Sequence, residues 1–134
     1  EACAAAMWAD DSAVQGLEIR RLAIGPGLAR LAMTIRPDMA NGHGIGHGGF
    51  VFALADSAFA YACNSRNQRM VAALADIAFL APARVGETLT AEAREVHLRG
   101  RSGVYDVSVY NEAGERIAEF RGHCRAIAGS VLPA

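Results

Sequence analysis

The segment "FVFALADSAFAYAC", residues 50–63, decides the fold of this chain. It is apolar on nearly every side, it is rich in alanine, and it is too long for a typical strand, which together favour a helix. We predict this helix from about residue 46 to about residue 64, buried on most of its faces. The segment is too short to cross a bilayer, and it carries a single charge, Asp56. An unpaired carboxylate in such a helix must be solvated, neutralised by a shifted pKa, or used.

Four strands are predicted after the helix. They cover segments 69–82, 87–98, 104–111 and 116–127, and "RGRSG" (99–103) and "EAG" (112–114) between the later ones are typical of turns. In the second segment the apolar alternation changes phase at Val96 and Leu98, which a β-bulge would explain. Three successive hairpin connections predict an antiparallel sheet, and the apolar helix would cover one of its faces.

Two further strands precede the helix. Segments 16–25 and 27–36 flank the turn signal "GPG", and in the second of them Ala29, Leu31, Met33 and Ile35 fall on one face. A short helix at about residues 1–12 is predicted before this hairpin. The order of elements predicts an α+β fold, with an antiparallel β-sheet packed on one long central helix and residues 1–134 forming a single domain.

The composition excludes several functional classes. The 134 residues carry a net charge of −1, so they provide no basic footprint for nucleic acid. All 13 basic residues are arginine, which excludes a Schiff-base lysine and a P-loop lysine. The three cysteines lie far apart and are odd in number, which argues against a disulfide framework and favours a reducing cytoplasm. We expect no signal peptide, because no basic segment precedes an apolar one at the start of the sequence.

The loop before the helix, "PDMANGHGIGHGG" (residues 37–49), is rich in glycine. Gly44, Gly46 and Gly49 spell GxGxxG, but a dinucleotide site needs a strand directly before this motif and alternating βαβ units after it. His43 and His47 lie four residues apart, but the glycines between them disfavour the helix that would make them joint metal ligands. A metal site is therefore a minor hypothesis.

The same loop suits the binding of an oxyanion. Gly48 and Gly49 are expected in the first turn of the helix, where N–H groups lack intrahelical partners and the helix dipole is positive. Glycine also lets a carbonyl group approach the backbone closely. The alternative, of equal weight, is that these glycines only allow a tight entry into a buried helix.

Asp56 comes eight residues after Gly48, which places it roughly 12 Å further along the helix axis. A site that uses both residues could therefore be completed by a second subunit. The alternative for Asp56 is a structural role, in which it caps nearby backbone or pairs with an arginine.

Three long segments of the chain carry a family resemblance. They are "NGHGIGHGGFVFALADSAFAYACNS" (41–65), "FLAPARVGETLTAEAREVH" (79–97) and "GVYDVSVYNEAGERIAEFRG" (103–122). They resemble the hotdog-fold acyl-CoA thioesterases, and most closely the PaaI-like, phenylacetic-acid-degradation subgroup. The resemblance implies a hotdog fold, in which an antiparallel sheet wraps around one long helix. It also implies a homodimer with active sites between its subunits, usually paired into a tetramer as a dimer of dimers.

The resemblance also implies roles for particular residues. Asp56 would be the catalytic carboxylate, which activates a water molecule or attacks the thioester, and the Gly48 N–H would polarise the thioester carbonyl. Asn41 and His47 match loop positions that shape the site, and we place Gly49 with them as a substrate-binding residue. The implied reaction is hydrolysis of phenylacetyl-CoA or hydroxyphenylacetyl-CoA, with no metal and no cofactor besides the coenzyme A of the substrate. Other aryl or medium-chain acyl-CoAs are alternative substrates.

Some positions depart from the family pattern, and other functions compete. Asp76 stands where relatives often carry a small hydroxyl residue, and would raise the pKa of Asp56 if it faced the site. Asp10 falls near a position where relatives carry an asparagine. Positive charge for the phosphates of CoA could come from Arg66, Arg69, Arg84, Arg99 or Arg101. A non-catalytic acyl-CoA sensor is the main rival, although an apolar acyl chain gains nothing from Asp56. A hotdog hydratase would need a histidine in "LADSAFAYA", which has none.

Overall fold

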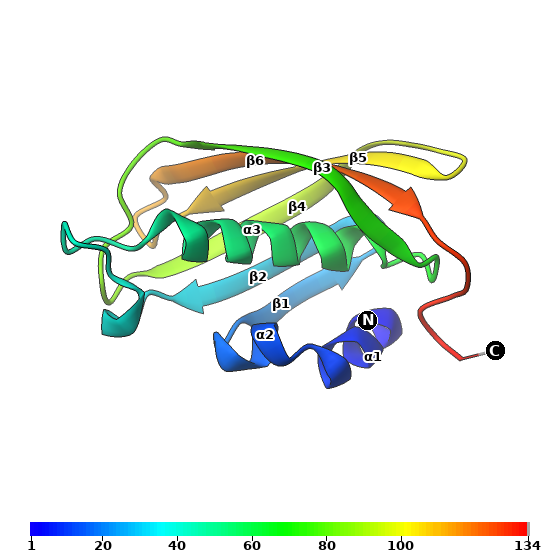
Figure 1. Cartoon of the computed structure of the whole chain (residues 1–134), viewed down its shortest axis with the longest axis horizontal. Coiled ribbons are helices and arrows are strands. Elements are labelled where there is room, and N and C mark those ends of the chain that lie inside the picture. Colours follow the sequence, from blue (N-terminus) through cyan, green and yellow to red (C-terminus); the bar gives the residue numbers. More distant parts are fainter. Residues whose placement is uncertain (134) are drawn as a thin grey trace.

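The computed structural model describes residues 1–133. The elements, in chain order, are α1 (Ala2–Asp10), α2 (Ser12–Gly16), β1 (Arg20–Gly25), β2 (Leu28–Thr34), the 3₁₀ turn η1 (Pro37–Met39), α3 (Gly48–Cys63), β3 (Met70–Phe79), β4 (Thr88–Arg99), β5 (Ser102–Tyr110) and β6 (Arg116–Ala126). The strands form one six-stranded sheet in the order β1-β2-β4-β5-β6-β3, and all neighbouring pairs are antiparallel. Figure 1 shows α3 lying along one face of this sheet, with α1 and α2 beside β1. The predicted α+β architecture, an antiparallel sheet around one long helix, is confirmed.

Alternate residues of the strands face α3 and form the core. Those of β2, β4 and β5 are Ala29, Leu31, Met33, Leu89, Ala91, Ala93, Tyr105, Val107 and Val109, all buried. In β6 the helix requires a glycine, because a Cβ atom on Gly122 would lie 2.8 Å from the Phe59 ring of α3. The predicted apolar face of segment 27–36 is therefore the face that packs against the helix.

The central helix begins and ends slightly inside its predicted limits of 46–64. It starts at Gly48 because His47 is its N-cap, with Nδ1 of the imidazole accepting a hydrogen bond from the Gly49 N–H at 3.0 Å. It ends at Cys63, where the chain turns toward β3. Since Nδ1 accepts this bond, the neutral His47 ring carries its proton on Nε2.

The predicted N-terminal helix of about residues 1–12 is interrupted. α1 ends at Asp10 and a second short helix, α2, begins at Ser12. Asp11 separates them, because its side chain accepts a hydrogen bond from the Val14 N–H at 3.1 Å and caps α2. Asp11, which was predicted to lie inside one helix, is therefore the N-cap of a second helix.

The phase change in β4 comes from a β-bulge, as predicted. The register between β4 and β5 shifts between Glu95 and His97. Leu98 packs against the core beyond this shift. Val96 does not, since it remains 50% exposed. The bulge leaves Val96 as the extra residue of the strand.

The two edges of the sheet differ. At the β1 edge, Arg21 pairs with Glu1 at 3.3 Å, and its guanidinium lies 5.8 Å from the centre of the Trp8 ring. The β3 edge is uncovered and apolar, with Leu74 61% exposed and Val71 also exposed. An open apolar edge strand is a template for pairing with another chain. Among residues 1–133, no helix is long and apolar enough to cross a membrane.

Candidate functional site

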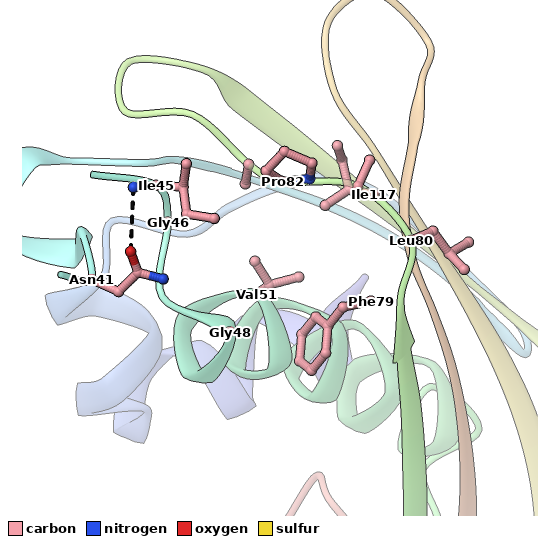
Figure 2. Close-up of a pocket in the computed structure, with 11 residues that line it drawn as sticks. Asn41, Ile45, Gly46, Gly48, Val51, Phe79, Leu80, Pro82 and Ile117 are labelled. Carbon is pink, nitrogen blue, oxygen red and sulfur yellow. Dashed lines mark hydrogen bonds between the residues drawn. The ribbon is translucent and has the colours of Figure 1, made fainter. Parts of the chain in front are cut away.

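The loop that leads into α3 is closed around the side chain of Asn41. Its Oδ1 accepts hydrogen bonds from the His43 N–H at 2.9 Å and the Ile45 N–H at 3.4 Å. The Asn41 backbone completes the turn, donating to the Ile45 carbonyl at 2.8 Å and accepting from the Gly44 N–H at 3.1 Å. Gly44 has a φ of +77°, which favours glycine. Figure 2 shows Asn41 with its amide nitrogen turned toward the start of α3.

The backbone N–H groups at the start of α3 are all bonded except one. The bonded groups are Gly46 to the Ala83 carbonyl (2.6 Å), His47 to the Met39 carbonyl (2.8 Å), Gly49 to His47 Nδ1 (3.0 Å) and Phe50 to the His47 carbonyl (3.0 Å). Within residues 1–133, the Gly48 N–H has no acceptor. An orphan donor at the positive end of a helix dipole is suited to an oxygen that carries negative charge.

Gly48 opens on a cavity of about 540 Å³. Its lining consists of Asn41, Ile45, Gly46, Gly48, Val51, Phe79, Leu80, Ala81, Pro82, Ala83 and Ile117 (Figure 2). Apart from the Asn41 amide and backbone groups, these side chains are apolar. Such a pocket, with a few convergent polar groups, is typical of a small-molecule site.

The sequence did not predict the apolar residues that line the cavity as part of the site. Phe79, Leu80, Pro82 and Ala83 come from the end of β3 and the following loop, and Ile117 comes from β6. The segment "FLAPARVGE" carried the signal, since it formed part of the family resemblance. The sequence could not tell that this segment folds back to the start of α3.

Asp56 lies elsewhere on α3. It is half-buried, and within residues 1–133 it has no hydrogen-bond or ion-pair partner, so neither the capping role nor the arginine pairing is found there. Burial raises the pKa of its carboxyl above the ordinary value. Asp56 does not line the cavity at Gly48. The structure thus brings Asn41 and Gly48 together but leaves Asp56 about two helical turns away from them.

His47 and Gly49 lie at the N-terminus of α3 and do not line the cavity. They bond to one another through the His47 cap. His43 is exposed in the loop. Among residues 1–133, no three His, Cys, Asp or Glu side chains come together as a metal site would require.

The two aspartates that depart from the family pattern, Asp76 and Asp10, lie in different parts of the structure. Asp76 of β3 lies opposite Arg121 of β6 in the strand register, and Arg121 forms an ion pair with Asp106 at 2.6 Å. This row lies on the face of the sheet opposite to α3, so Asp76 does not face Asp56. Asp10 lines a groove of about 430 Å³ together with Ala60, which lies one turn after Asp56 on α3.

Two of the five arginines considered for CoA phosphates are engaged within the chain. Arg66 forms two hydrogen bonds to the Glu95 carboxylate, at 3.1 and 3.2 Å. Arg101 donates to the Ala126 carbonyl at 2.9 Å. Arg99 lines a depression of about 570 Å³ that also contains Arg125. The structure does not single out one of these groups as a phosphate ligand.

Comparison with known proteins finds close matches. The family model of the thioesterase superfamily matches residues 43–118. The chain is 41% identical to the acyl-coenzyme A thioesterase PaaI of Escherichia coli over 126 residues, which cover 94% of this chain and 90% of that protein.

Solved structures agree with this similarity. The E. coli PaaI protein from the phenylacetic acid degradation operon superposes with a TM-score of 0.95 at 41% identity, covering 96% of this chain and 94% of that one. A mutant of the phenylacetic acid degradation protein PaaI from Thermus thermophilus superposes with a TM-score of 0.84 at 38% identity, covering 87% of this chain and 100% of that one. The hotdog fold and the resemblance predicted from the sequence are confirmed.

Proposed function

This chain belongs to the thioesterase superfamily and is a PaaI-like acyl-CoA thioesterase, and from that premise we propose that it hydrolyses aryl-acetyl-CoA thioesters to the free acid and CoA. Phenylacetyl-CoA and hydroxyphenylacetyl-CoA are the proposed substrates. The main support for this proposal is that the Gly48 N–H lacks an acceptor within residues 1–133, and that Gly48 lines an apolar cavity of about 540 Å³. The names of two relatives, which place them in phenylacetic acid degradation, support the choice of acyl group.

In the proposed mechanism, the Gly48 N–H donates to the thioester carbonyl oxygen. This bond strengthens as negative charge develops on the oxygen, and the helix dipole adds to it. The Asn41 side-chain amide is the second polar group beside the thioester carbonyl oxygen, and hydrogen bonds from the loop fix the oxygen of this amide in place. We propose no metal and no cofactor besides the CoA of the substrate.

Asp56 supplies the base or the nucleophile. As a base it takes a proton from water while the water oxygen attacks the carbonyl carbon, and the proton then passes to the departing CoA thiolate. As a nucleophile its carboxylate forms a mixed anhydride, which water hydrolyses after CoA has left. The raised pKa of Asp56 makes its carboxylate a stronger base than an exposed aspartate.

We propose that each site is shared between two protomers of a homodimer. Gly48 and Asp56 are roughly 12 Å apart along one helix, too far to act on one thioester carbon. The uncovered β3 edge, with Leu74 61% exposed, is the surface proposed for pairing with the partner. Asp56 of one protomer would then face the partner's Gly48, and two such dimers would form the tetramer. The cytoplasm is the proposed compartment, since the three cysteines are free thiols.

The first test is thiol release from phenylacetyl-CoA, hydroxyphenylacetyl-CoA, benzoyl-CoA and a medium-chain acyl-CoA. We expect the aryl-acetyl substrates to react fastest, and Asp56→Asn to lower kcat by about 10²–10⁴-fold while substrate binding survives. Asp76→Asn is the matched control, because Asp76 lies on the opposite face of the sheet and should leave kcat unchanged. Binding without hydrolysis in the wild type would instead identify a sensor.

Mixing two inactive variants tests the shared site. A dimer of one Asp56→Asn chain and one Gly48→Pro chain contains one intact site if each site draws Asp56 and Gly48 from different protomers. After subunit exchange, random pairing should restore about a quarter of the wild-type activity. No recovery, with exchange verified by mass spectrometry, would contradict the inter-subunit site.

A further inference from the structure

The ring of Phe79 lies directly against Gly48. A Cβ atom built on Gly48 would be 3.1 Å from Cζ of this ring and 3.3 Å from Cε1. Figure 2 shows the ring at the side of the cavity where α3 begins, next to Val51. Glycine at position 48 thus serves two purposes, because it admits both a substrate carbonyl and the aromatic ring.

Core packing does not account for this ring. Phe79 is 55% exposed, at the last position of β3, and it does not belong to the buried core. Its neighbour Leu80 is also 55% exposed and lines the same cavity, but the three atoms nearest to a Cβ at Gly48 all belong to the Phe79 ring. A large aromatic group held beside an orphan N–H donor removes water from one side of that donor.

Exclusion of water at this point has a chemical consequence. A hydrogen bond to a developing oxyanion is stronger where the local dielectric is low. A ring fixed against the backbone also limits where the carbonyl oxygen can sit, and a misplacement of about 1 Å can cost about 10²-fold in rate. Both effects act on the transition state more than on substrate binding.

We propose that Phe79 is a positioning residue for thioester hydrolysis, whose ring bounds the oxyanion site at Gly48 and holds the carbonyl in line with the Gly48 N–H. This inference rests on the proposed function of the same site. It adds a specific prediction, that removal of the ring lowers kcat while removal of an equally exposed neighbour that lines the cavity does not.

The experiment compares Phe79→Ala, Phe79→Leu, Phe79→Tyr and the matched control Leu80→Ala on phenylacetyl-CoA. We expect kcat to fall about 10-fold to 100-fold in Phe79→Ala, and by a smaller factor in Phe79→Leu, with KM changed little. Phe79→Tyr keeps the ring and should keep kcat within about threefold of the wild type. Leu80→Ala should raise KM and leave kcat within the same range. Equal kcat in Phe79→Ala and Leu80→Ala, or no rescue by tyrosine, would overturn the proposal.

A double-mutant cycle with Gly48→Ala tests the contact itself. In the wild-type background the new Cβ must displace the Phe79 ring, whereas in Phe79→Ala the ring is absent. The two substitutions should therefore be non-additive, with the double variant hardly slower than Phe79→Ala. Additive losses in kcat would contradict the contact.

Failure of this inference can be told from failure of the proposed function. An inactive wild type would overturn both. An active wild type that Asp56→Asn inactivates, together with Phe79→Ala that matches Leu80→Ala, would overturn only the role of Phe79. Melting temperatures of all variants separate these outcomes from unfolding.

Discussion

The two ends of α3 treat their polar groups in opposite ways. At the C-terminal end, the buried Asn64 side chain donates to the Ala60 carbonyl at 2.9 Å and the Met70 carbonyl at 3.2 Å, and accepts from the Met70 N–H at 2.9 Å. At the N-terminal end, the Gly48 N–H has no acceptor within residues 1–133. A helix end that is satisfied internally stabilises the fold, whereas an end with a free donor beside a cavity is available to a ligand. The C-terminal end of α3 is therefore structural, whereas the N-terminal end is the one for which we propose a role in the reaction.

Among changes at the two ends of α3, removing the free donor should have the largest effect. Gly48→Pro deletes the N–H at the first position of α3, where proline is well tolerated and where His47 already has the extended backbone that must precede proline. We expect kcat to fall about 10²–10³-fold with little change in the melting temperature. Steady-state kinetics with phenylacetyl-CoA provide the measurement.

Gly48→Ala is the control for this change, because it adds a side chain but keeps the N–H. It should lose less activity than Gly48→Pro. If both variants lose the same activity, the side chain rather than the donor is responsible, and the open end of α3 has no role as an oxyanion site.

Disruption of the satisfied end should have the converse effect. Asn64→Ala removes the side-chain partner of the Met70 N–H and the Met70 carbonyl in a buried place, so we expect a loss of about 3 kcal/mol in the free energy of unfolding. The Ala60 carbonyl keeps the hydrogen bond from the backbone N–H of residue 64 at 3.1 Å. Urea denaturation measures this loss. The activity per folded molecule, assayed well below the melting temperature, should stay close to that of the wild type. A strong fall in kcat would show that the C-terminal end of α3 also takes part in the chemistry.

Local patterns predicted most of this arrangement, and long-range contacts account for what they missed. Apolar length and alternation located α3 and the strands, and the single charge of residues 50–63 pointed to Asp56. The position of Asp76 could have been predicted, since alternation along β3 sets it opposite to Ala75 and Ile77, which pack against the core.

Other features depend on parts of the chain that are distant in sequence. The exposed Val96 follows from a bulge against β5, and the contact of Phe79 with Gly48 follows from the return of β3 to the start of α3. The bond from Gly49 to His47, which leaves Gly48 as the free donor, depends on a side-chain orientation. A shared site would depend on a second chain, which no local pattern contains.

The pH dependence of stability tests Asp56, which lies between the two ends of α3. Burial raises the pKa of its carboxyl in the folded state, so the folded chain holds a proton that the unfolded chain has already released. The cost of the buried charge is therefore fully present above the folded pKa and absent below the unfolded value of about 4. We expect Asp56→Asn to melt at a higher temperature than the wild type at pH 7, with the difference shrinking as the pH falls toward 4. Thermal melts of the two proteins across this range measure the difference, and a difference that does not change with pH would contradict the cost of the buried charge.

The smallest expected effect concerns His47, which joins the loop to the open end of α3. His47→Ala removes the N-cap of α3, so we expect a loss of about 1 kcal/mol in stability and a few-fold fall in kcat as the first turn loosens. Asparagine is a good N-cap, so His47→Asn should recover most of both losses. Urea denaturation and kinetics on the two variants test this role. If His47 instead transferred a proton in the reaction, His47→Asn would be as slow as His47→Ala despite its restored stability, because an amide cannot accept and release a proton as an imidazole does. A recovered kcat would therefore place His47 in support of Gly48 and leave Asp56 as the group that handles the proton.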